Sequence, residues 1–230
     1  MFFNLGVLVS YTNNINHCWN NGTIQIMKRE LKVDIEKFER LYTRNIDVGN
    51  RILYFCPWQP NEEMVADDKT WEVNDWTAQN IIKGLHFLDG RNHRKITIRW
   101  LSYGGDYDAG MAIYDVIKEI KSPVVLHAYG RIRSMGTIIL QACKYRLLSP
   151  HCLFMIHYGT AGQDSTHTKD LQKFAEQVAR ENTTMEDIYL SKIRKVHPRY
   201  TREKLQDLMK YDKYMAPKEA IELGLVDGVM

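Results

Sequence analysis

Hydrophobic and polar positions follow two different periods along this chain. Residues 95–101 (KITIRWL) alternate polar and apolar side chains, which is typical of a β-strand. The turn-forming residues 102–105 (SYGG) come next, and apolar residues then recur at helical spacing through 108–121. This order predicts a unit made of a strand, a glycine-containing turn and a helix.

The same two periods continue along the rest of the chain. A second strand, 123–129, is expected to end at Gly130, and 134–143 reads as a nearly all-apolar helix that must be buried. Further strands are expected at 51–56, 145–148, 152–158 and 225–230, and further helices between Asn74 and Gly90, at 168–194, at 201–209 and between Pro217 and Gly224. Alternating strands and helices predict an α/β fold.

The chain length favours one domain with an appended segment. A length of 230 residues suits a single core, since cores stop growing at roughly 250–300 residues. Residues 12–24 are rich in Asn and show no periodicity, and Met27 is a plausible beginning of the folded unit. We therefore expect an N-terminal extension or entrance segment at 1–45 and the folded domain at 46–230. The short apolar start lacks a positively charged region, so no secretory signal is expected.

Composition excludes several classes of function. The net charge is +3 with basic and acidic residues interspersed, so no nucleic acid partner is expected. No apolar run approaches the roughly 20 residues that cross a bilayer, so no membrane association is expected. The cysteines are scattered without a CxxC pair, which favours a reducing compartment, cytoplasmic or the equivalent organelle stroma or matrix, and no bound metal. Their positions are Cys18, Cys56, Cys143 and Cys152.

Ser134 is the candidate nucleophile. Acyl transfer from a peptide needs a nucleophile, a base, a group that orients the base and N–H donors for the oxyanion. Ser134 follows a strand and a glycine at the first turn of an apolar helix, where backbone N–H groups are free. The N–H of Met135 would point toward the oxyanion. Gly105, in the turn after 95–101, would supply the second N–H, because no side chain stands in the way there.

His157 is the candidate base. It lies at the end of an apolar strand (LFMIH) with a polar loop directly after it, where a side chain is exposed to a cleft. The other seven histidines lie mid-strand, in loops or on helix faces, where structural or solvated roles are favoured. Asp212 is the candidate for the group that orients the base. Two alternatives to this triad stay open at this level: Ser134 as an ordinary helix N-cap and Asp212 as a surface residue between helices.

Five motifs occur in an order that resembles the Clp protease proteolytic subunit family. They are SYGGDYDAGMAIYD at 102–115, SMG at 134–136, MIH at 155–157, KYDKYM at 210–215, and EA at 219–220 with GLVD at 224–227. The resemblance spans 96–229. It implies that Ser134, His157 and Asp212 form a catalytic triad and that the N–H groups of Gly105 and Met135 form the oxyanion hole.

The resemblance also implies a fold and an assembly. The implied fold is a ClpP- or crotonase-like ββα spiral, in which the helix beginning near Thr168 protrudes as a handle. The implied assembly is a homo-oligomer of two stacked heptameric rings that enclose the active sites and cleave peptides or unfolded proteins without a cofactor. No G-x-x-x-x-G-K-[ST] loop occurs, so a separate ring ATPase would unfold substrates.

The sequence departs from the family pattern beside the candidate site. Tyr103 stands where proline is usual, 131–133 (RIR) replaces small or neutral residues, and Tyr158-Gly159 replaces Gln-Pro. Arg133 could favour acidic peptides or form a salt bridge with a ring neighbour. Three further functions stay open: a crotonase-like acyl-coenzyme A enzyme, a catalytically silent ring subunit, and a viral head-maturation or structural protein.

Overall fold

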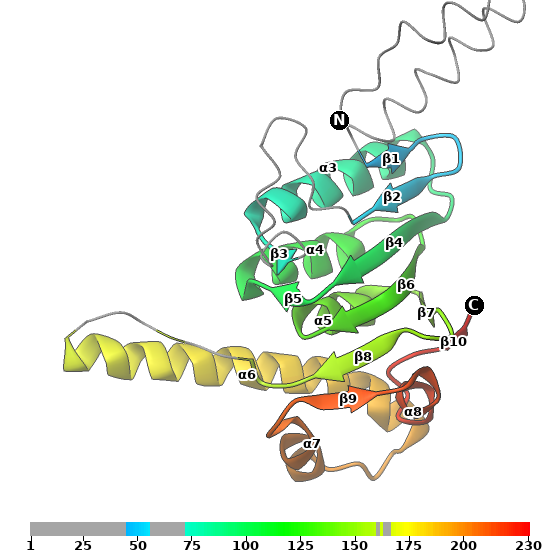
Figure 1. Cartoon of the computed structure of the whole chain (residues 1–230). Helices are drawn as coiled ribbons and strands as arrows, with labels where there is room; N and C mark the ends of the chain where they lie inside the picture. The colour runs from blue at the N-terminus through cyan, green and yellow to red at the C-terminus, as the bar shows by residue number, and fades with distance from the viewer. Residues whose placement is uncertain (1–44, 56–71, 160–161, 163–166) are drawn as a thin grey trace, which may run out of the picture. The chain divides into compact units, whose positions relative to one another are not determined.

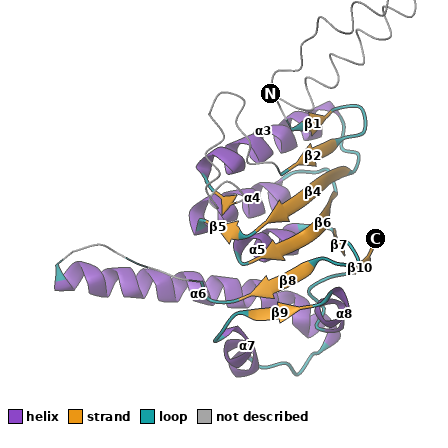
Figure 2. Ribbon diagram, in the orientation of Figure 1, coloured by secondary structure: helices purple, strands orange, loops and turns teal. Residues whose placement is uncertain are grey.

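The alternating apolar segments of the sequence form an eight-stranded mixed sheet covered by helices (Figures 1 and 2). A computed structural model describes residues 45–55, 72–159, 162 and 167–230. The chain divides into two units, Met1–Tyr42 and Thr43–Met230, and the described residues belong to the second. The expected extension at 1–45 lies almost wholly outside the described residues and stays a prediction, as does the domain boundary.

All predicted strands and helices appear in the predicted order, together with four short strands of two or three residues that the sequence did not predict. The strands are β1 (Ile46–Asp47), β2 (Ile52–Tyr54), β3 (Glu72–Val73), β4 (Ile96–Ser102), β5 (Gly104–Gly105), β6 (Val124–Arg133), β7 (Tyr145–Leu148), β8 (Leu153–Ile156), β9 (Lys213–Met215) and β10 (Gly228–Val229). The helices are α3 (Asp75–Arg91), α4 (Tyr107–Glu119), α5 (Met135–Ala142), α6 (Thr168–Val196), α7 (Arg202–Met209) and α8 (Pro217–Glu222). The predicted α/β class is therefore confirmed.

Strand β6 is the centre of the sheet and has different neighbours at its two ends. The strand order is β1-β2-β4-β6-β7-β10, and β8 also pairs with β6 and carries β9 at its other side. The first half of β6 pairs with β7, whereas 131–133 pair with 153–155 of β8. All of these pairs are parallel except β1–β2 and β8–β9. Consequently, β6, β8 and β9 converge at the carboxyl end of β6.

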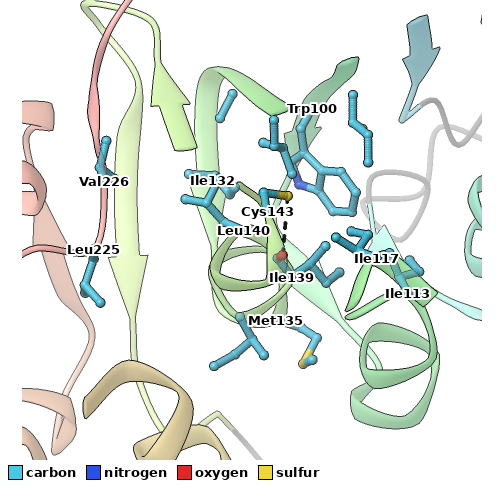
Figure 3. Packing of buried hydrophobic residues seen from close by; sticks show 14 of the residues in the cluster. Trp100, Ile113, Ile117, Ile132, Met135, Ile139, Leu140, Cys143, Leu225 and Val226 are labelled. Carbon is cyan, nitrogen blue, oxygen red and sulfur yellow. Dashed lines mark hydrogen bonds between the residues drawn. The ribbon is translucent and has the colours of Figure 1, made fainter. Parts of the chain in front are cut away.

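Helices α3, α4 and α5 lie side by side along the sheet and bury its apolar side (Figure 1). Trp100 of β4, Ile132 of β6 and Ile139 of α5 meet in this core (Figure 3), and each is at most 1% exposed. The predicted burial of the 134–143 helix is confirmed, because seven of the eight residues of α5 are buried. This packing holds the start of α5 against the end of β6.

Among the differences from the sequence prediction, three concern glycines that the sequence places in turns or at the ends of elements. Strand β6 does not end at Gly130, because this residue takes a φ of 61° and absorbs a register irregularity, after which pairing with β4 resumes. The expected turn at 102–105 contains the short strand β5, which pairs with β3. Helix α3 runs past Gly90 to Arg91 and has Asn92 as its C-cap.

Helix α6 extends well beyond the sheet (Figure 1). It has 29 residues, and its buried positions all lie in the C-terminal half, from Glu186 to Ile193. The N-terminal half is mostly exposed. The predicted long helix is thus confirmed, and its first half presents a surface that no other described part of the chain covers.

Candidate active site

Ser134 sits at a strained junction between β6 and α5. Its backbone has φ 48° and ψ −126°, a combination that costs an L-residue about 1–3 kcal/mol. Its N–H donates to the carbonyl of Met155 at 2.9 Å, and its own carbonyl accepts from the Thr137 N–H at 2.8 Å and the Thr137 Oγ1 at 2.6 Å. Ser134 occupies the N-cap position but makes no side-chain capping bond, so the ordinary N-cap interpretation is wrong.

A buried chain of hydroxyl groups supports this junction from α6. Thr137 Oγ1 lies 2.6 Å from the hydroxyl of Tyr189, whose side chain is 1% exposed. Because the single Thr137 hydroxyl hydrogen goes to the Ser134 carbonyl, Tyr189 must donate to Thr137. Burial raises the pKa of Tyr189 well above its ordinary value, which keeps this donor protonated. Helix α6 therefore helps to fix the backbone of Ser134.

His157 and Asp212 meet through the pairing of β8 and β9. His157 directly follows β8, Asp212 directly precedes β9, and the antiparallel register sets Ile156 opposite Lys213. His157 Nδ1 lies 2.9 Å from Asp212 Oδ1, and His157 Nε2 lies 2.8 Å from Ser134 Oγ. The structure therefore brings all three predicted residues into one hydrogen-bonded line.

The acceptor Asp212 determines how this line is protonated. A carboxylate only accepts hydrogen bonds, so the imidazole hydrogen must lie on Nδ1 and Nε2 must accept from the Ser134 hydroxyl. This is the tautomer that a general base toward Ser134 requires. Asp212 is 51% exposed at its side chain and His157 21%, so the line opens to solvent on the carboxylate side.

Tyr214 is a site residue that the sequence prediction missed. Its hydroxyl donates to Asp212 Oδ2 at 3.3 Å, while Oδ1 faces His157. Positions 212 and 214 project to the same side because strand residues alternate, so recognition of β9 in the sequence would have indicated this contact. Tyr214 thereby helps to orient a carboxylate that is otherwise half exposed.

Strand β5, which carries the predicted oxyanion donor Gly105, passes beside the nucleophile turn at Gly104. A Cβ atom at Gly104 would stand 3.1 Å from the Met135 nitrogen, so β5 passes directly beside the start of α5. Gly105 has a φ of 140°, and a Cβ there would overlap the backbone of Val73. Both glycines are therefore required by close backbone approach. The assignment of the Gly105 and Met135 N–H groups to an oxyanion stays a prediction.

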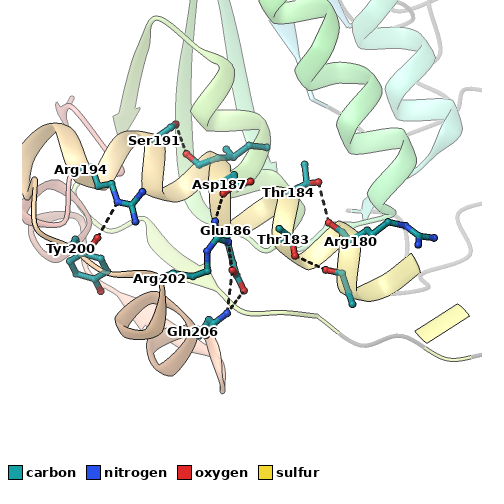
Figure 4. A network of polar contacts seen from close by, with 12 residues as sticks. Arg180, Thr183, Thr184, Glu186, Asp187, Ser191, Arg194, Tyr200, Arg202 and Gln206 are labelled. Atoms are coloured by element: carbon teal, nitrogen blue, oxygen red, sulfur yellow. Dashed lines mark hydrogen bonds and ion pairs between the residues drawn. The ribbon is translucent and has the colours of Figure 1, made fainter. Parts of the chain in front are cut away.

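Tyr158 anchors the base to α6 and α7. Its hydroxyl donates to Glu186 Oε1 at 2.6 Å, and Glu186, which is 4% exposed, also accepts from Arg202 and Gln206 (Figure 4). Arg202 additionally pairs with Asp187. Tyr158, which follows His157, and helix α7, which precedes Asp212, thus both contact the buried carboxylate of Glu186.

The described part of the chain offers neither a reactive cysteine nor a cluster of metal ligands. Cys143 and Cys152 are buried, and burial raises the pKa of each thiol to about 12, so neither forms a reactive thiolate at neutral pH. No group of three or more His, Cys, Asp or Glu in these ranges could hold a metal ion. None of the described helices combines the length and apolarity of a membrane span.

Comparisons with known proteins agree with the fold. The family model described as Clp protease matches residues 68–230. The ATP-dependent Clp protease proteolytic subunit of Deinococcus radiodurans is 35% identical over 161 residues, which cover 69% of this chain and 76% of that protein. A solved ClpP1 mutant from Listeria monocytogenes superposes with a TM-score of 0.66 at 22% identity, covering 80% of this chain and 92% of that chain. The ClpP-like fold expected from the sequence is thereby confirmed.

Proposed function

The chain belongs to the Clp protease family, and from this premise we propose that it is the serine endopeptidase subunit of a ring-shaped, self-compartmentalising protease. Family membership makes it a serine-type peptidase of the ClpP type. The observation that carries the residue assignment is the hydrogen-bonded line from Asp212 through His157 to Ser134. Ser134 is the nucleophile, His157 the general base and Asp212 the residue that orients it.

The proposed reaction proceeds through an acyl-enzyme. His157 Nε2 takes the proton of Ser134 Oγ as this oxygen attacks the scissile carbonyl carbon, and the oxyanion accepts hydrogen bonds from the Met135 and Gly105 N–H groups. His157 then gives the proton to the leaving amine, and the peptide bond breaks. A water molecule, deprotonated by His157, attacks the ester, and the proton returns to Ser134 as the acid product leaves. Asp212 stabilises the imidazolium in both halves.

The exposed half of α6 supports the proposed assembly. Two stacked heptameric rings would use this amphipathic helix as a handle and enclose the Ser134 sites. Because the sequence contains no phosphate-binding G-x-x-x-x-G-K-[ST] loop, a separate ring ATPase would unfold and deliver folded substrates. The enzyme alone would cleave small peptides, in the cytoplasm or an equivalent organelle compartment.

Labelling with a fluorophosphonate probe tests the nucleophile. Ser134 Oγ should displace fluoride and add one phosphonyl group per chain, which intact-mass spectrometry detects. Ser134→Ala should abolish labelling and lower peptide turnover by about 10⁶-fold, as loss of the nucleophile does in other serine peptidases. Ser149→Ala, at a turn whose backbone alone is hydrogen-bonded, is the matched control and should label fully.

The same measurement separates the rival functions. A crotonase-like enzyme needs no Ser, His and Asp line, and it would leave Ser134 unlabelled. A catalytically silent ring subunit or a viral structural protein would assemble, but it would neither react with the probe nor cut any peptide. Full labelling of the Ser134→Ala variant would refute the assignment directly.

A further inference from the structure

Four side chains beside the candidate site form an alternating column, which we call the arginine–tyrosine stack. The Cζ atom of Arg131 lies 3.9 Å from the centre of the Tyr103 ring. The Cζ atom of Arg133 lies 5.2 Å from the same ring and 5.3 Å from the ring of Tyr214. All three distances are within the roughly 6 Å at which a cation is attracted to an aromatic face. Three of the four residues stand at or beside the positions where this chain departs from its family pattern.

Strand pairing explains why the column forms. Arg133 of β6 is in register with Met155 of β8, which in turn is in register with Tyr214 of β9. Side chains at matched positions point to the same side of a sheet. The intervening residues Ile132 and Phe154 are completely buried in the core, so the stack faces the opposite side. It is thus a fixed feature of the sheet next to Ser134.

The two arginines have no carboxylate partner among the residues that the structure describes. The Nε atoms of Arg131 and Arg133 are buried and form no hydrogen bond, although an unpaired buried N–H group is costly. Elsewhere the chain satisfies its partly buried arginines: Arg146 binds Asp227, and Arg202 binds Glu186 and Asp187. The stack therefore holds two oriented cations that lack an anion.

Asp212, the carboxylate that contacts the stack through Tyr214, is already engaged. Asp212 Oδ1 faces His157 and Oδ2 accepts from Tyr214, so both oxygens have partners within the site. Lys210 and Lys213 flank Asp212 in the sequence and add positive charge to the same segment. An anion that satisfies the arginines must therefore come from outside the described residues.

A bound peptide substrate would bring such an anion within reach. Arg133 precedes Ser134, so their Cα atoms are about 3.8 Å apart, and an extended peptide advances about 3.3 Å per residue. Guanidinium groups bind carboxylates with paired N–H donors, and stacking on Tyr103 fixes their planes. We propose that the arginine–tyrosine stack is a specificity subsite for an acidic side chain within three residues of the scissile bond. This inference rests on the proposed peptidase function.

Matched peptides test the subsite. The substrates are internally quenched peptides derived from one neutral sequence, whose cleaved bond is located by mass spectrometry. Each peptide of a pair carries either Glu or Gln at one of the three positions on either side of that bond. The readout is the Glu-to-Gln ratio of kcat/KM at low ionic strength. We expect at least one position with a ratio of about 10, the size of one charge-assisted hydrogen bond, and a decline as salt is added.

Variants of Arg131 and Arg133 test whether these residues cause the Glu-to-Gln ratio of kcat/KM. Arg131→Gln combined with Arg133→Gln should bring the ratio to about 1, as neither neutral side chain attracts a carboxylate. Arg99→Gln is the matched control, because Arg99 also stacks on a tyrosine, Tyr54, but lies upstream on β4. It should keep the wild-type ratio. Arg133→Lys keeps the charge and loses the planar fork, so it should give an intermediate ratio even if the double variant does not fold.

Each remaining outcome overturns the inference. If the wild-type Glu-to-Gln ratio of kcat/KM is 1 or less at all six positions, the proposed subsite is refuted. Cleavage of the neutral peptides in the same assay would still support the proposed peptidase function. An unchanged ratio in the double variant, with a changed oligomer mass in size-exclusion chromatography, would assign the arginines to a contact between subunits instead. Absence of both cleavage and probe labelling would overturn the subsite and the proposed function together.

Discussion

Gly104 lies so close to Ser134 that a Cβ atom at position 104 would stand 2.6 Å from the Cβ atom of Ser134. The same atom would lie 3.0 Å from the Arg133 carbonyl and 3.1 Å from the Met135 nitrogen. Gly104 also has a φ of 107°, which side chains other than glycine rarely adopt. The nucleophile can hold its position only because residue 104 has no side chain.

Gly104→Ala should therefore reduce catalysis more than stability. The methyl group must displace Ser134, and a misplacement of about 1 Å can lower turnover about 100-fold. Gly90→Ala is the matched control, because a Cβ at Gly90 meets nothing within 4 Å and lies inside helix α3. It should keep full activity and gain about 0.5–1 kcal/mol of stability. Peptide kinetics and urea denaturation measure both effects, and equal activity of the two variants would contradict the role of Gly104.

Asp212→Asn should lower kcat by about 10³–10⁴-fold without unfolding the protein. An asparagine amide can donate to His157 Nδ1, which favours the tautomer with its hydrogen on Nε2 and removes the acceptor for the Ser134 proton. The measurement is kcat for a small peptide at neutral pH. Asp207→Asn, at an exposed position of α7, is the control and should retain wild-type turnover.

Most of the fold can be predicted from the sequence, because apolar residues recur at a clear strand or helix period in the longer elements. Strand β4, helix α4 and helix α5 appear as predicted, and the positions of Ser134 and His157 follow from the ends of apolar segments. The proximity of Asp212 does not follow from any local pattern. It depends on β9, whose three residues Lys213–Met215 are too few to show a period, and on its antiparallel pairing with β8.

The contacts of the arginine–tyrosine stack, which cross several strands, cannot be predicted from a local sequence pattern either. Tyr103, Arg131 and Arg133 are separate departures from the family pattern in the sequence, and only the register of β4, β6, β8 and β9 brings them together with Tyr214. In the sequence, Gly130 predicts the end of a strand, because glycine is unfavourable within one. In the structure it permits an irregularity and the strand continues, which carries both arginines onto the sheet.

Tyr158→Phe should destabilise the protein by about 1.5–3 kcal/mol, the value of a hydrogen bond to a charged group. Glu186 would lose the Tyr158 hydroxyl and keep only Arg202 and Gln206. The midpoint of urea denaturation measures this loss. Tyr211→Phe, at a side chain that is 77% exposed, is the control and should leave the midpoint unchanged. An equal shift in both variants would show that the hydroxyl contact with Glu186 contributes nothing.

The closing motif GLVD at 224–227 has a structural role that predicts a specific dependence on pH. Arg146 donates to both carboxylate oxygens of Asp227 and also to Gln141 and to the carbonyl of Gly224, which ties β7 to the C-terminal segment. Burial alone would raise the pKa of Asp227, but the hydrogen bonds and positive charge of Arg146 hold it below its ordinary value. The folded state therefore favours the ionised carboxylate more than the unfolded state does.

Asp227→Asn should consequently reduce the pH dependence of stability at acid pH. A carboxylate with a lowered pKa in the folded state contributes stability that is fully present above its ordinary pKa, near 4, and is lost as the pH falls through the lowered value. The wild-type free energy of unfolding should thus fall more between pH 7 and about pH 3 than that of the variant, which is already less stable at pH 7. Urea denaturation at both pH values measures the difference, with the exposed Asp115→Asn as control. Parallel curves for wild type and Asp227→Asn would mean that the Arg146 contact does not stabilise the ionised form.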